Sequence, residues 1–273
     1  MTEDTDVARH YSSGTLMSRI RKALHDAGIE TSLDPDRLAP LDEFHVGGRA
    51  ATVPLIKELK LGPGKYALDL GCGLGGPARY AAGKTGAAVV GVDITAEFVT
   101  AAEELTRLCG LANKVKHVHA SILDLPFSDN IFDAAFMMHV GMNIADKHRI
   151  AEEAARVLKP GSVFAIYDIM RLSEDDLIYP VPWAQSPRQS AVVASDRYRF
   201  ALEDAGFEIV SETNLTEVAL ANSDGQAEGT DGPDQIGVNI LLGQDGSEKV
   251  KNLLANIRSG LVAPKVIVAR LSE

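Results

Sequence analysis

Two carboxylates and a run of glycines form the first candidate site of the chain. Asp69 stands two residues before Gly71, the first of the glycines at positions 71, 73, 75 and 76. Because glycine has no Cβ, the backbone can turn sharply here and approach a ligand. Asp69 can then meet an ammonium group across the loop. Asp93 follows about twenty residues later, where a carboxylate can accept hydrogen bonds from ribose hydroxyls. The spacing predicts a ligand that carries both an amino group and a ribose.

The same glycines are compatible with two nucleotide ligands. Gly71, Gly73 and Gly76 also have the G-x-G-x-x-G spacing of dinucleotide-binding proteins. A carboxylate at Asp69 would be badly placed against a pyrophosphate, whereas it suits an amino group. We therefore predict S-adenosylmethionine as the cofactor, with S-adenosylhomocysteine as its product. An NAD-dependent oxidoreductase stays open as the alternative.

The chain resembles the class I S-adenosylmethionine-dependent methyltransferases from about Val7 to Leu271. Within that group it is similar to the small-molecule enzymes typified by sarcosine/dimethylglycine N-methyltransferases and by ubiquinone/menaquinone-biosynthesis methyltransferases. A segment that looks like the N-methyltransferase branch spans Asp42 to Arg49. The other segments that carry the resemblance are 69–76, 91–93, 125–127 with Asp129, 132–133 and 156–161.

The resemblance implies a single methyltransferase domain over residues 1–273. Residues 1–60 would form an N-terminal helical cover, 61–170 the cofactor-binding core, and 171–273 the acceptor-side loops, an insert and the last strands. The implied fold is α/β and Rossmann-like, with a seven-stranded, mostly parallel sheet and helices on both faces. The implied cofactor contacts are Asp69, Gly71, Cys72, Gly73, Gly75, Asp93, Ile94, Ser121, Ile122, His139 and Tyr11.

Three of these cofactor positions have a second interpretation. In the resembled family the position of Ser121 often holds an acid that bonds the adenine amino group, so the contact of Ser121 would be weaker or indirect. The backbone N–H of Ile122 would meet the adenine ring. Cys72 is equally explained as a small packing residue in the loop. Tyr11 either bounds the cofactor pocket or packs the N-terminal helix against the core.

Short apolar runs and their turn residues predict the elements that position these residues. The predicted strands are 65–70, 88–93, 114–120, 132–140, 162–167, 207–213 and 264–271. The predicted helices are 14–27, 77–84, 96–109, 147–158, 195–205 and 247–259, and one that ends at Leu59 and is delayed or kinked by Pro54. Pro35 and Pro40 predict a connector over 33–41, and residues 214–260 give no clear pattern outside the helix at 247–259.

The candidate acceptor residues follow the predicted central strand. Ligands in open α/β sheets bind at the carboxyl ends of strands. His139, Met142 and Asn143 lie at the carboxyl end of 132–140, where methyl donor and acceptor would meet. His139 is therefore our first candidate for a catalytic base, and a structural hydrogen bond is its alternative role.

Three more residues are candidates for the acceptor pocket. Phe44 and His45 belong to the segment similar to the N-methyltransferases, and His45 is the second candidate base or a structural hydrogen-bonding residue. Trp183, the only tryptophan, follows two prolines in Tyr179-Pro-Val-Pro-Trp183. It forms either a stiff wall of the pocket or a hydrophobic plug beneath the loop.

Methyl transfer is an in-line displacement that requires alignment of the reactants and exclusion of water. A base is needed only when the acceptor must lose a proton, as a hydroxyl or an acidic carbon must. The predicted function is therefore methyl transfer to a small-molecule amine, hydroxyl or activated carbon. A non-catalytic S-adenosylmethionine-binding partner subunit is a third hypothesis. No His, Cys or carboxylate cluster has convincing metal-ligand spacing, so we expect no metal.

The amino-acid composition limits the kinds of partner that we expect for this protein. A formal charge of −11 over 273 residues disfavours a nucleic-acid partner. No apolar run reaches the roughly 18 residues of a membrane span, and the acidic start does not resemble a signal peptide. Two cysteines, Cys72 and Cys109, suit a reducing compartment. We therefore expect a cytoplasmic protein without a membrane partner, with a homodimer as the assembly to test.

Overall fold

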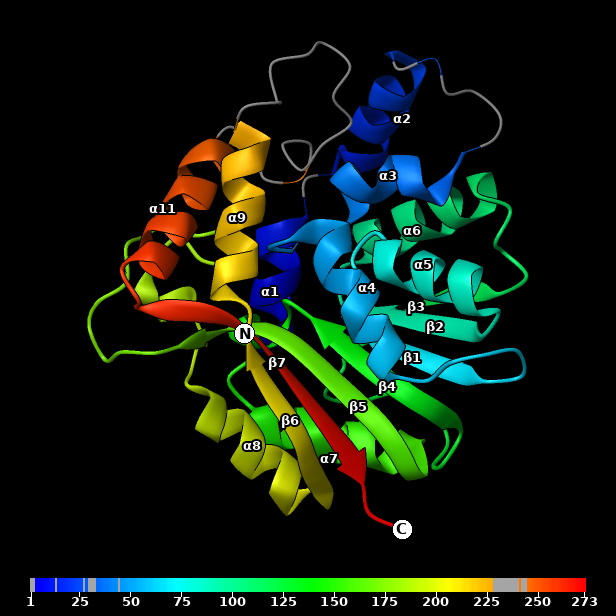
Figure 1. The fold of residues 1–273 in the computed structure, drawn as a ribbon. Coiled ribbons are helices and arrows are strands. Elements are labelled where there is room, and N and C mark those ends of the chain that lie inside the picture. Colours follow the sequence, from blue (N-terminus) through cyan, green and yellow to red (C-terminus); the bar gives the residue numbers. More distant parts are fainter. Residues whose placement is uncertain are drawn as a thin grey trace.

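The computed structural model describes residues 3–12, 14–26, 28, 33–43, 45–227, 241 and 245–273. Its centre is a seven-stranded sheet in the order β3-β2-β1-β4-β5-β7-β6 (Figure 1). Neighbouring strands from β3 to β5 are parallel, whereas β7 is antiparallel to both β5 and β6. The strands are β1 (Tyr66–Leu70), β2 (Ala88–Asp93), β3 (Val115–His119), β4 (Phe132–Met138), β5 (Leu158–Arg171), β6 (Phe207–Asn214) and β7 (Val262–Leu271). The predicted mostly parallel α/β sheet is confirmed.

Helices cover both faces of the sheet. The α-helices are α1 (Glu3–Tyr11), α2 (Leu16–Asp26), α3 (Pro35–Asp42), α4 (Gly48–Glu58), α5 (Gly76–Thr85), α6 (Ala96–Leu108), α7 (Lys147–Val157), α8 (Ser195–Asp204), α9 (Thr216–Ala227) and α11 (Gly246–Arg258). Two short 3₁₀ turns are η1 (Gly141–Asn143) and η2 (Pro187–Gln189). Among the described residues, no helix is long and apolar enough to span a bilayer.

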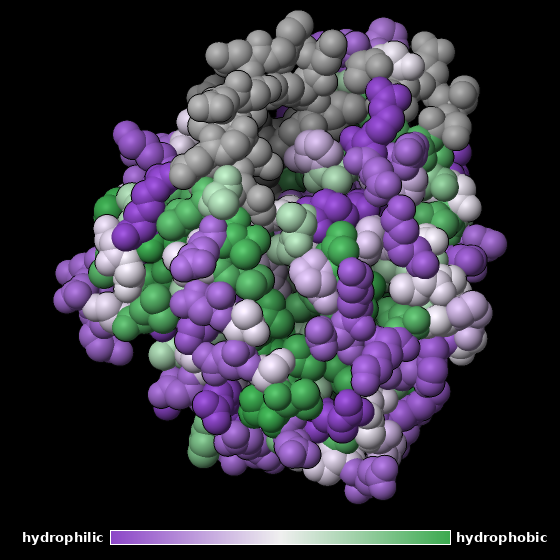
Figure 2. All heavy atoms as spheres, in the orientation of Figure 1, coloured by the Kyte–Doolittle hydropathy of each residue, from purple (hydrophilic) through white to green (hydrophobic). Residues whose placement is uncertain are grey.

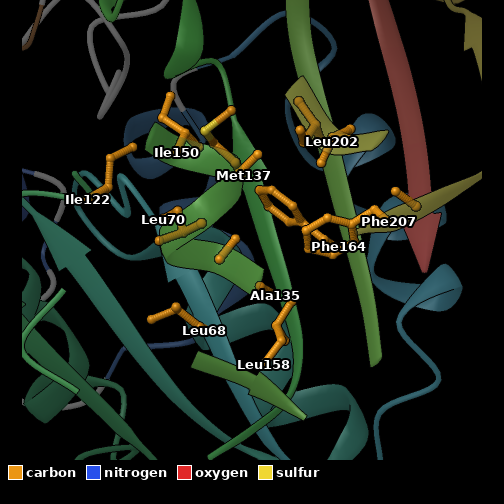
Figure 3. Close-up of a cluster of buried hydrophobic side chains, with 14 of the residues drawn as sticks. Leu68, Leu70, Ile122, Ala135, Met137, Ile150, Leu158, Phe164, Leu202 and Phe207 are labelled. Carbon is orange, nitrogen blue, oxygen red and sulfur yellow. The ribbon is translucent and has the colours of Figure 1, made fainter. Parts of the chain in front are cut away.

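The central strand β4 is apolar throughout because both of its faces are buried. Successive side chains of a strand point to opposite faces. Phe136 packs with α4 and α5 on one face, whereas Met137 packs on the other with Ile150 of α7 and Leu202 of α8 (Figure 3). These buried clusters on the two faces of the sheet hold β4 in position. The candidate acceptor residues follow directly after β4.

The N-terminal helices pack on α5 and α6, above the glycine loop. Leu16 and Ile20 of α2 share a buried cluster with Phe98 and Leu105 of α6, and Figure 1 shows α2 and α3 next to α6 and α5. The N-terminus of α2 is bound by Glu97, whose carboxylate accepts from the backbone N–H of Leu16 at 2.6 Å. An anion suits a helix N-terminus, because the first N–H groups of a helix lack partners.

The predicted connector over 33–41 is wrong, because most of it forms α3. Pro35 occupies the first turn of α3, where no N–H is required. The side chain of Asp34 accepts from the backbone N–H of Asp36 at 2.9 Å and so caps the helix. The helix that ends near Leu59 also differs from expectation, since α4 begins at Gly48 and continues through Pro54.

The described residues of the last third of the chain include one helix, α9, that the sequence analysis did not predict. The predicted helix 247–259 is present as α11, but α9 forms where no clear pattern was found. The two helices lie side by side near the carboxyl end of the sheet (Figure 1). They contribute residues to the cavity described next.

Candidate active site

A cavity of about 660 Å³ opens at the carboxyl ends of β1, β2 and β4. Its described lining comes from the glycine loop, the ends of these strands, the N-terminal helices, α9 and α11. The predicted site residues found in this lining are Tyr11, His45, Asp69, Gly71, Cys72, Gly73, Asp93, Ile94, Ile122, His139, Met142, Asn143 and Trp183. Residues that are far apart in the sequence therefore meet in one cavity.

The glycine loop is held in place by backbone hydrogen bonds from β2. The carbonyl of Val92 accepts from the N–H groups of Gly71 and Cys72 at 2.8 and 2.9 Å. The two carboxylate oxygens of Asp93 accept from the N–H groups of Gly73 at 2.9 Å and Thr95 at 2.8 Å. A carboxylate oxygen can accept more than one hydrogen bond, so Asp93 retains capacity for a ligand. The loop and Asp93 thus form one rigid edge of the cavity.

A larger residue at position 71 would force the neighbouring side chain of Val140 to move. Its φ is +78°, and an added Cβ would lie 2.4 Å from the Cγ2 atom of Val140. Backbone at this φ favours glycine. The close approach of Gly71 to Val140 joins the glycine loop to the chain that leaves β4.

Asp69 is buried near the end of β1, and one of its carboxylate oxygens has no hydrogen-bond partner. Its side chain is 2% exposed, and its Oδ2 atom has no hydrogen-bond partner. Burial raises the pKa of Asp69 well above its usual value, and the charge of Asp93 adds to this effect. A buried carboxylate oxygen without a donor is costly. The ammonium group of S-adenosylmethionine would supply such a donor, so the residues present fit this cofactor.

His139 follows β4 in a left-handed conformation with φ of 56°. Its Nε2 atom is buried without a hydrogen-bond partner. The imidazole ring lies 4.8 Å from the ring of Tyr167 and 5.9 Å from that of His45, measured between centroids. Burial lowers the pKa of His139 well below the usual value. The imidazole is therefore neutral near pH 7 and has a nitrogen available to a ligand.

The Nε2 atom of His45 is hydrogen-bonded, in contrast to that of His139. Its Nε2 atom lies 3.0 Å from the carbonyl oxygen of Gly48 and 3.1 Å from the Thr52 hydroxyl. A carbonyl oxygen only accepts hydrogen bonds, so Nε2 of His45 carries the proton. Burial lowers the pKa of His45 to about 4. These contacts support the structural interpretation of His45, although its ring lines the cavity.

Tyr11 connects the N-terminal cover with the end of β4. It is the last residue of α1, and its hydroxyl donates to Oδ1 of Asn143 at 3.1 Å. The amide nitrogen of Asn143 in turn donates to the carbonyl of Val140 at 3.0 Å. The ring of Tyr11 also lies 5.8 Å from that of Phe98. Tyr11 therefore both bounds the cavity and packs against the core, as the two interpretations required.

Trp183 likewise lies both at the cavity and in a buried cluster. Its indole N–H donates to the Ser190 hydroxyl at 2.9 Å, which fixes the orientation of the ring. It packs in a buried cluster with Met142 and Leu253 and also lines the cavity.

Three predicted site residues are not in the described lining. Gly75 starts α5 and packs against His117 instead. The Ser121 hydroxyl accepts from the N–H of Leu123 at 3.1 Å, which is a turn contact. Phe44 lies outside the described residues. Gly75 and Ser121 are thus better placed to shape the loops than to touch a ligand.

Several lining residues were missed by the sequence analysis. Glu43 and Arg49 lie in the segment that was singled out for resemblance, but no role was inferred for their charges. Leu253 and Leu254 lie on the predicted apolar face of the helix at 247–259, and that face was the available signal. Other missed lining residues include Asp4, Val7, Asp36, Asp42, Met138, Ala219, Leu241 and Val250.

No metal site is visible in the part of the chain that the structure describes. There, no group of three or more His, Cys, Asp or Glu residues is placed to hold an ion. The expectation of metal-free chemistry stays a prediction.

Sequence comparison places a known domain over the cavity-forming core. Residues 68–166 match the family model described as a methyltransferase domain. The chain is 32% identical over 187 residues to methyltransferase GfsG of Streptomyces halstedii, covering 67% of this chain and 66% of that protein. It is 32% identical over 177 residues to cycloartenol-C-24-methyltransferase 1 of Oryza sativa subsp. japonica, covering 60% of this chain and 49% of that protein. The matched region is thus less than two thirds of the length of these relatives.

Solved structures share the fold over nearly the whole chain. Geranyl diphosphate C-methyltransferase from Streptomyces coelicolor A3(2), solved with Mg²⁺, geranyl-S-thiolodiphosphate and S-adenosylhomocysteine, has a TM-score of 0.71 and 18% identity, covering 99% of this chain and 98% of that one. A putative sarcosine dimethylglycine methyltransferase from Galdieria sulphuraria has a TM-score of 0.67 and 21% identity, covering 93% and 98%. At these identities the likeness is one of fold.

Proposed function

We propose that this chain, which belongs to the S-adenosylmethionine-dependent methyltransferases, transfers a methyl group from that cofactor to a small-molecule acceptor. The observation that carries the proposal is the buried Oδ2 atom of Asp69, which lacks a hydrogen-bond donor and lies in the same cavity as Asp93. One carboxylate suits the amino group of the cofactor and the other suits its ribose. When bound, the cofactor supplies the activated methyl group and leaves as S-adenosylhomocysteine.

The residues of the chain would orient this cofactor from three sides. Asp69 would accept from its ammonium group, and Asp93 from its ribose hydroxyls. The backbone of Gly71 and Gly73 would lie against it, because no side chain intervenes. The further contacts that we propose are Cys72, Ile94, Ile122, His139 and Tyr11, with Gly75 and Ser121 acting indirectly through the shape of their loops.

His139 is our proposed base for an acceptor that must lose a proton. Its unpartnered Nε2 and its neutral state at pH 7 support this role, because a general base needs a free lone pair. His45 has its Nε2 bound to Gly48, so we propose that it positions the loop next to the base. Phe44, Met142, Asn143 and Trp183 remain our proposed acceptor pocket.

The names of the relatives favour a carbon acceptor over an amine. Several relatives are named C-methyltransferases, among them those for cycloartenol and botryococcene. A proton must leave after methylation of such a carbon, which suits the proposed role of His139. Neither an NAD-dependent oxidoreductase nor a non-catalytic subunit is named among these relatives.

Calorimetric titration with S-adenosylmethionine, S-adenosylhomocysteine and NAD tests the cofactor. We expect the first two to bind and NAD to give no heat. Asp69→Asn should weaken binding by at least tenfold, whereas Asp124→Asn, which alters an exposed turn acid outside the cavity, should not. Binding of NAD alone would overturn the proposal. Cofactor binding without turnover on any amine, phenol or alkene acceptor would favour the non-catalytic subunit.

We also propose a cytoplasmic, homodimeric protein without nucleic-acid or membrane partners. The formal charge of −11 supports the absence of a nucleic-acid partner, and the two cysteines suit a reducing compartment such as the cytoplasm. Sedimentation analysis of the purified chain tests the dimer, and a monomer at micromolar concentration would contradict it.

A further inference from the structure

One part of the cavity lining, here called the apolar half, consists of Val7, Met142, Trp183, Ala219, Leu241, Val250, Leu253 and Leu254. Trp183 and Met142 pack in one buried cluster with Leu253 of α11. Figure 2 shows hydrophobic residues gathered over α9 and α11, the helices that contribute Ala219, Val250, Leu253 and Leu254. An apolar wall of this kind stabilises a ligand by removing apolar surface from water.

The described lining of the cavity contains six acidic residues and one basic residue. Arg49 is the one Lys or Arg in its described lining. The guanidinium of Arg49 is already bound to the carboxylate of Glu43 and, at 2.7 Å, to that of Asp36. It also lies 4.4 Å from the centroid of the Tyr80 ring. The acids in the lining are Asp4, Asp36, Asp42, Glu43, Asp69 and Asp93. No cation of this lining is therefore left to neutralise an anionic ligand.

The two histidines of the lining do not change this balance. Burial lowers the pKa of His45 to about 4 and that of His139 well below the usual value. Both imidazoles are neutral near pH 7. Each can hold a hydrogen bond, but neither supplies a positive charge.

The residues outside the described part contain no basic side chain. Residues 228–240 and 242–244, which flank Leu241, contain no Lys, Arg or His. The same holds for residues 1–2, 13, 27, 29–32 and 44. Every Lys and Arg of the chain is thus among the described residues.

We infer that the acceptor is a mainly apolar molecule without an anionic group, whose apolar body lies along Trp183 and Leu254. This inference rests on the proposed function and specifies its substrate class. A phosphate, diphosphate or carboxylate group in this cavity would lose its hydration without gaining a counter-charge from the described lining, which is unfavourable. The acidic residues of the lining instead suit the cationic cofactor. The structure thus favours a lipid-like acceptor without an anionic group over a prenyl diphosphate or an amino acid.

The fluorescence of the only tryptophan provides a direct test. Trp183 lines the apolar half, so its emission should report a ligand bound there. Geraniol, geranylamine and geranyl diphosphate share one carbon skeleton and differ in charge, and each is titrated into the protein saturated with S-adenosylhomocysteine. We expect geraniol and geranylamine each to change the emission with an affinity at least tenfold higher than that of the diphosphate. Equal or tighter binding of the diphosphate, or no response to geraniol, would overturn the inference.

Two variants test whether the charge inside the cavity determines the affinity for an anionic ligand. Leu254→Arg places a cation in the cavity and should raise the affinity for geranyl diphosphate at least tenfold while weakening geraniol. Leu172→Arg makes the same change at an exposed position outside the cavity and should alter neither affinity. An unchanged diphosphate affinity in Leu254→Arg would contradict the electrostatic argument. Failure of S-adenosylhomocysteine to bind in calorimetry would instead contradict the proposed function, so the two failures are distinguishable.

Discussion

Arg79 of α5 and Asp42 of α3 form an ion pair in which both side chains are almost completely buried. The same guanidinium donates to the Thr106 hydroxyl of α6 at 3.0 Å. Thr106 in turn lies 2.9 Å from the Nε2 atom of His117 on β3. The Arg79–Asp42 pair thus connects the N-terminal cover with the helix that begins at the glycine loop, and it does so beneath the cavity.

Removing one member of this pair should strongly destabilise the protein. Asp42→Ala would leave the buried guanidinium of Arg79 without its counter-charge, which typically costs about 3–5 kcal/mol. We expect a loss of that size in the free energy of unfolding measured with urea. Asp26→Ala removes an exposed acid that pairs with Lys22 and should leave the unfolding midpoint unchanged. Equal midpoints for the Asp42 variant and the wild type would show that the pair contributes no stability.

The hydroxyl of Tyr11 should contribute to closure of the cavity. Tyr11→Phe keeps the ring against Phe98 but removes the hydrogen bond to Asn143. Loss of such a bond costs about 1 kcal/mol, or roughly a fivefold change in an equilibrium constant. We expect the dissociation constant of S-adenosylhomocysteine, measured by calorimetry, to rise about fivefold.

Tyr66→Phe is the matched control for this change. Tyr66 stacks on Phe132 at 4.7 Å, away from the cavity. An equal rise in the dissociation constant for both variants would show that the Tyr11 hydroxyl acts only through overall stability.

Two glycines of the same region should respond to alanine in opposite directions. Gly71→Ala forces a Cβ against Val140 at a φ of +78°, so we expect a loss of about 1–3 kcal/mol in stability. Gly83 lies exposed inside α5, and an added Cβ there meets nothing within 4 Å. Gly83→Ala should therefore stabilise the protein by about 0.5–1 kcal/mol. Urea unfolding measures the free energy of unfolding of both variants. A stabilising effect of Gly71→Ala would contradict the close contact between Gly71 and Val140.

The burial of His45 should make stability depend on pH. Its pKa is about 4 in the folded protein, against 6.5 for an ordinary histidine. As the pH falls from 6.5 to 4, the unfolded chain binds a proton at this position and the folded chain does not. The contribution of His45 is therefore complete above pH 6.5 and decreases on acidification.

Urea unfolding between pH 4 and 7 measures this contribution. The difference in unfolding free energy between the wild type and His45→Gln should shrink toward pH 4. The corresponding difference for the exposed His25→Gln should stay constant. A His45 difference that does not change with pH would contradict the buried neutral state.

Local patterns were sufficient to predict the cofactor side of the cavity. The strand before Asp69, the glycine turn and the acid at 93 follow one another within one βαβ unit, so sequence neighbours determine their positions. The positions of these residues depend on the local backbone conformation and on the direction of the parallel strands. Short sequence patterns predict both of these well.

The contacts between distant segments could not be predicted in this way. Arg79 and Asp42 are polar, so a pattern analysis assigns both to the surface, and only their mutual neutralisation allows burial. Tyr11 and Asn143 are 132 residues apart, and nothing in either segment indicates the other. Pro35 and Pro40 suggested a connector, but the cap provided by Asp34 allows a helix to begin there.

His139 offers the sharpest test of the proposed chemistry. If its Nε2 atom removes a proton from the acceptor, His139→Ala should lower kcat by about 10²–10⁴-fold. The dissociation constant for S-adenosylmethionine should change little, because Asp69 and Asp93 hold the cofactor in the proposal. Since burial keeps the pKa of His139 well below its usual value, the wild-type kcat should also stay constant from pH 8 to 6. Single-turnover kinetics and calorimetry separate the two quantities. Equal losses in kcat and in cofactor affinity would assign His139 to the cofactor site instead of the base.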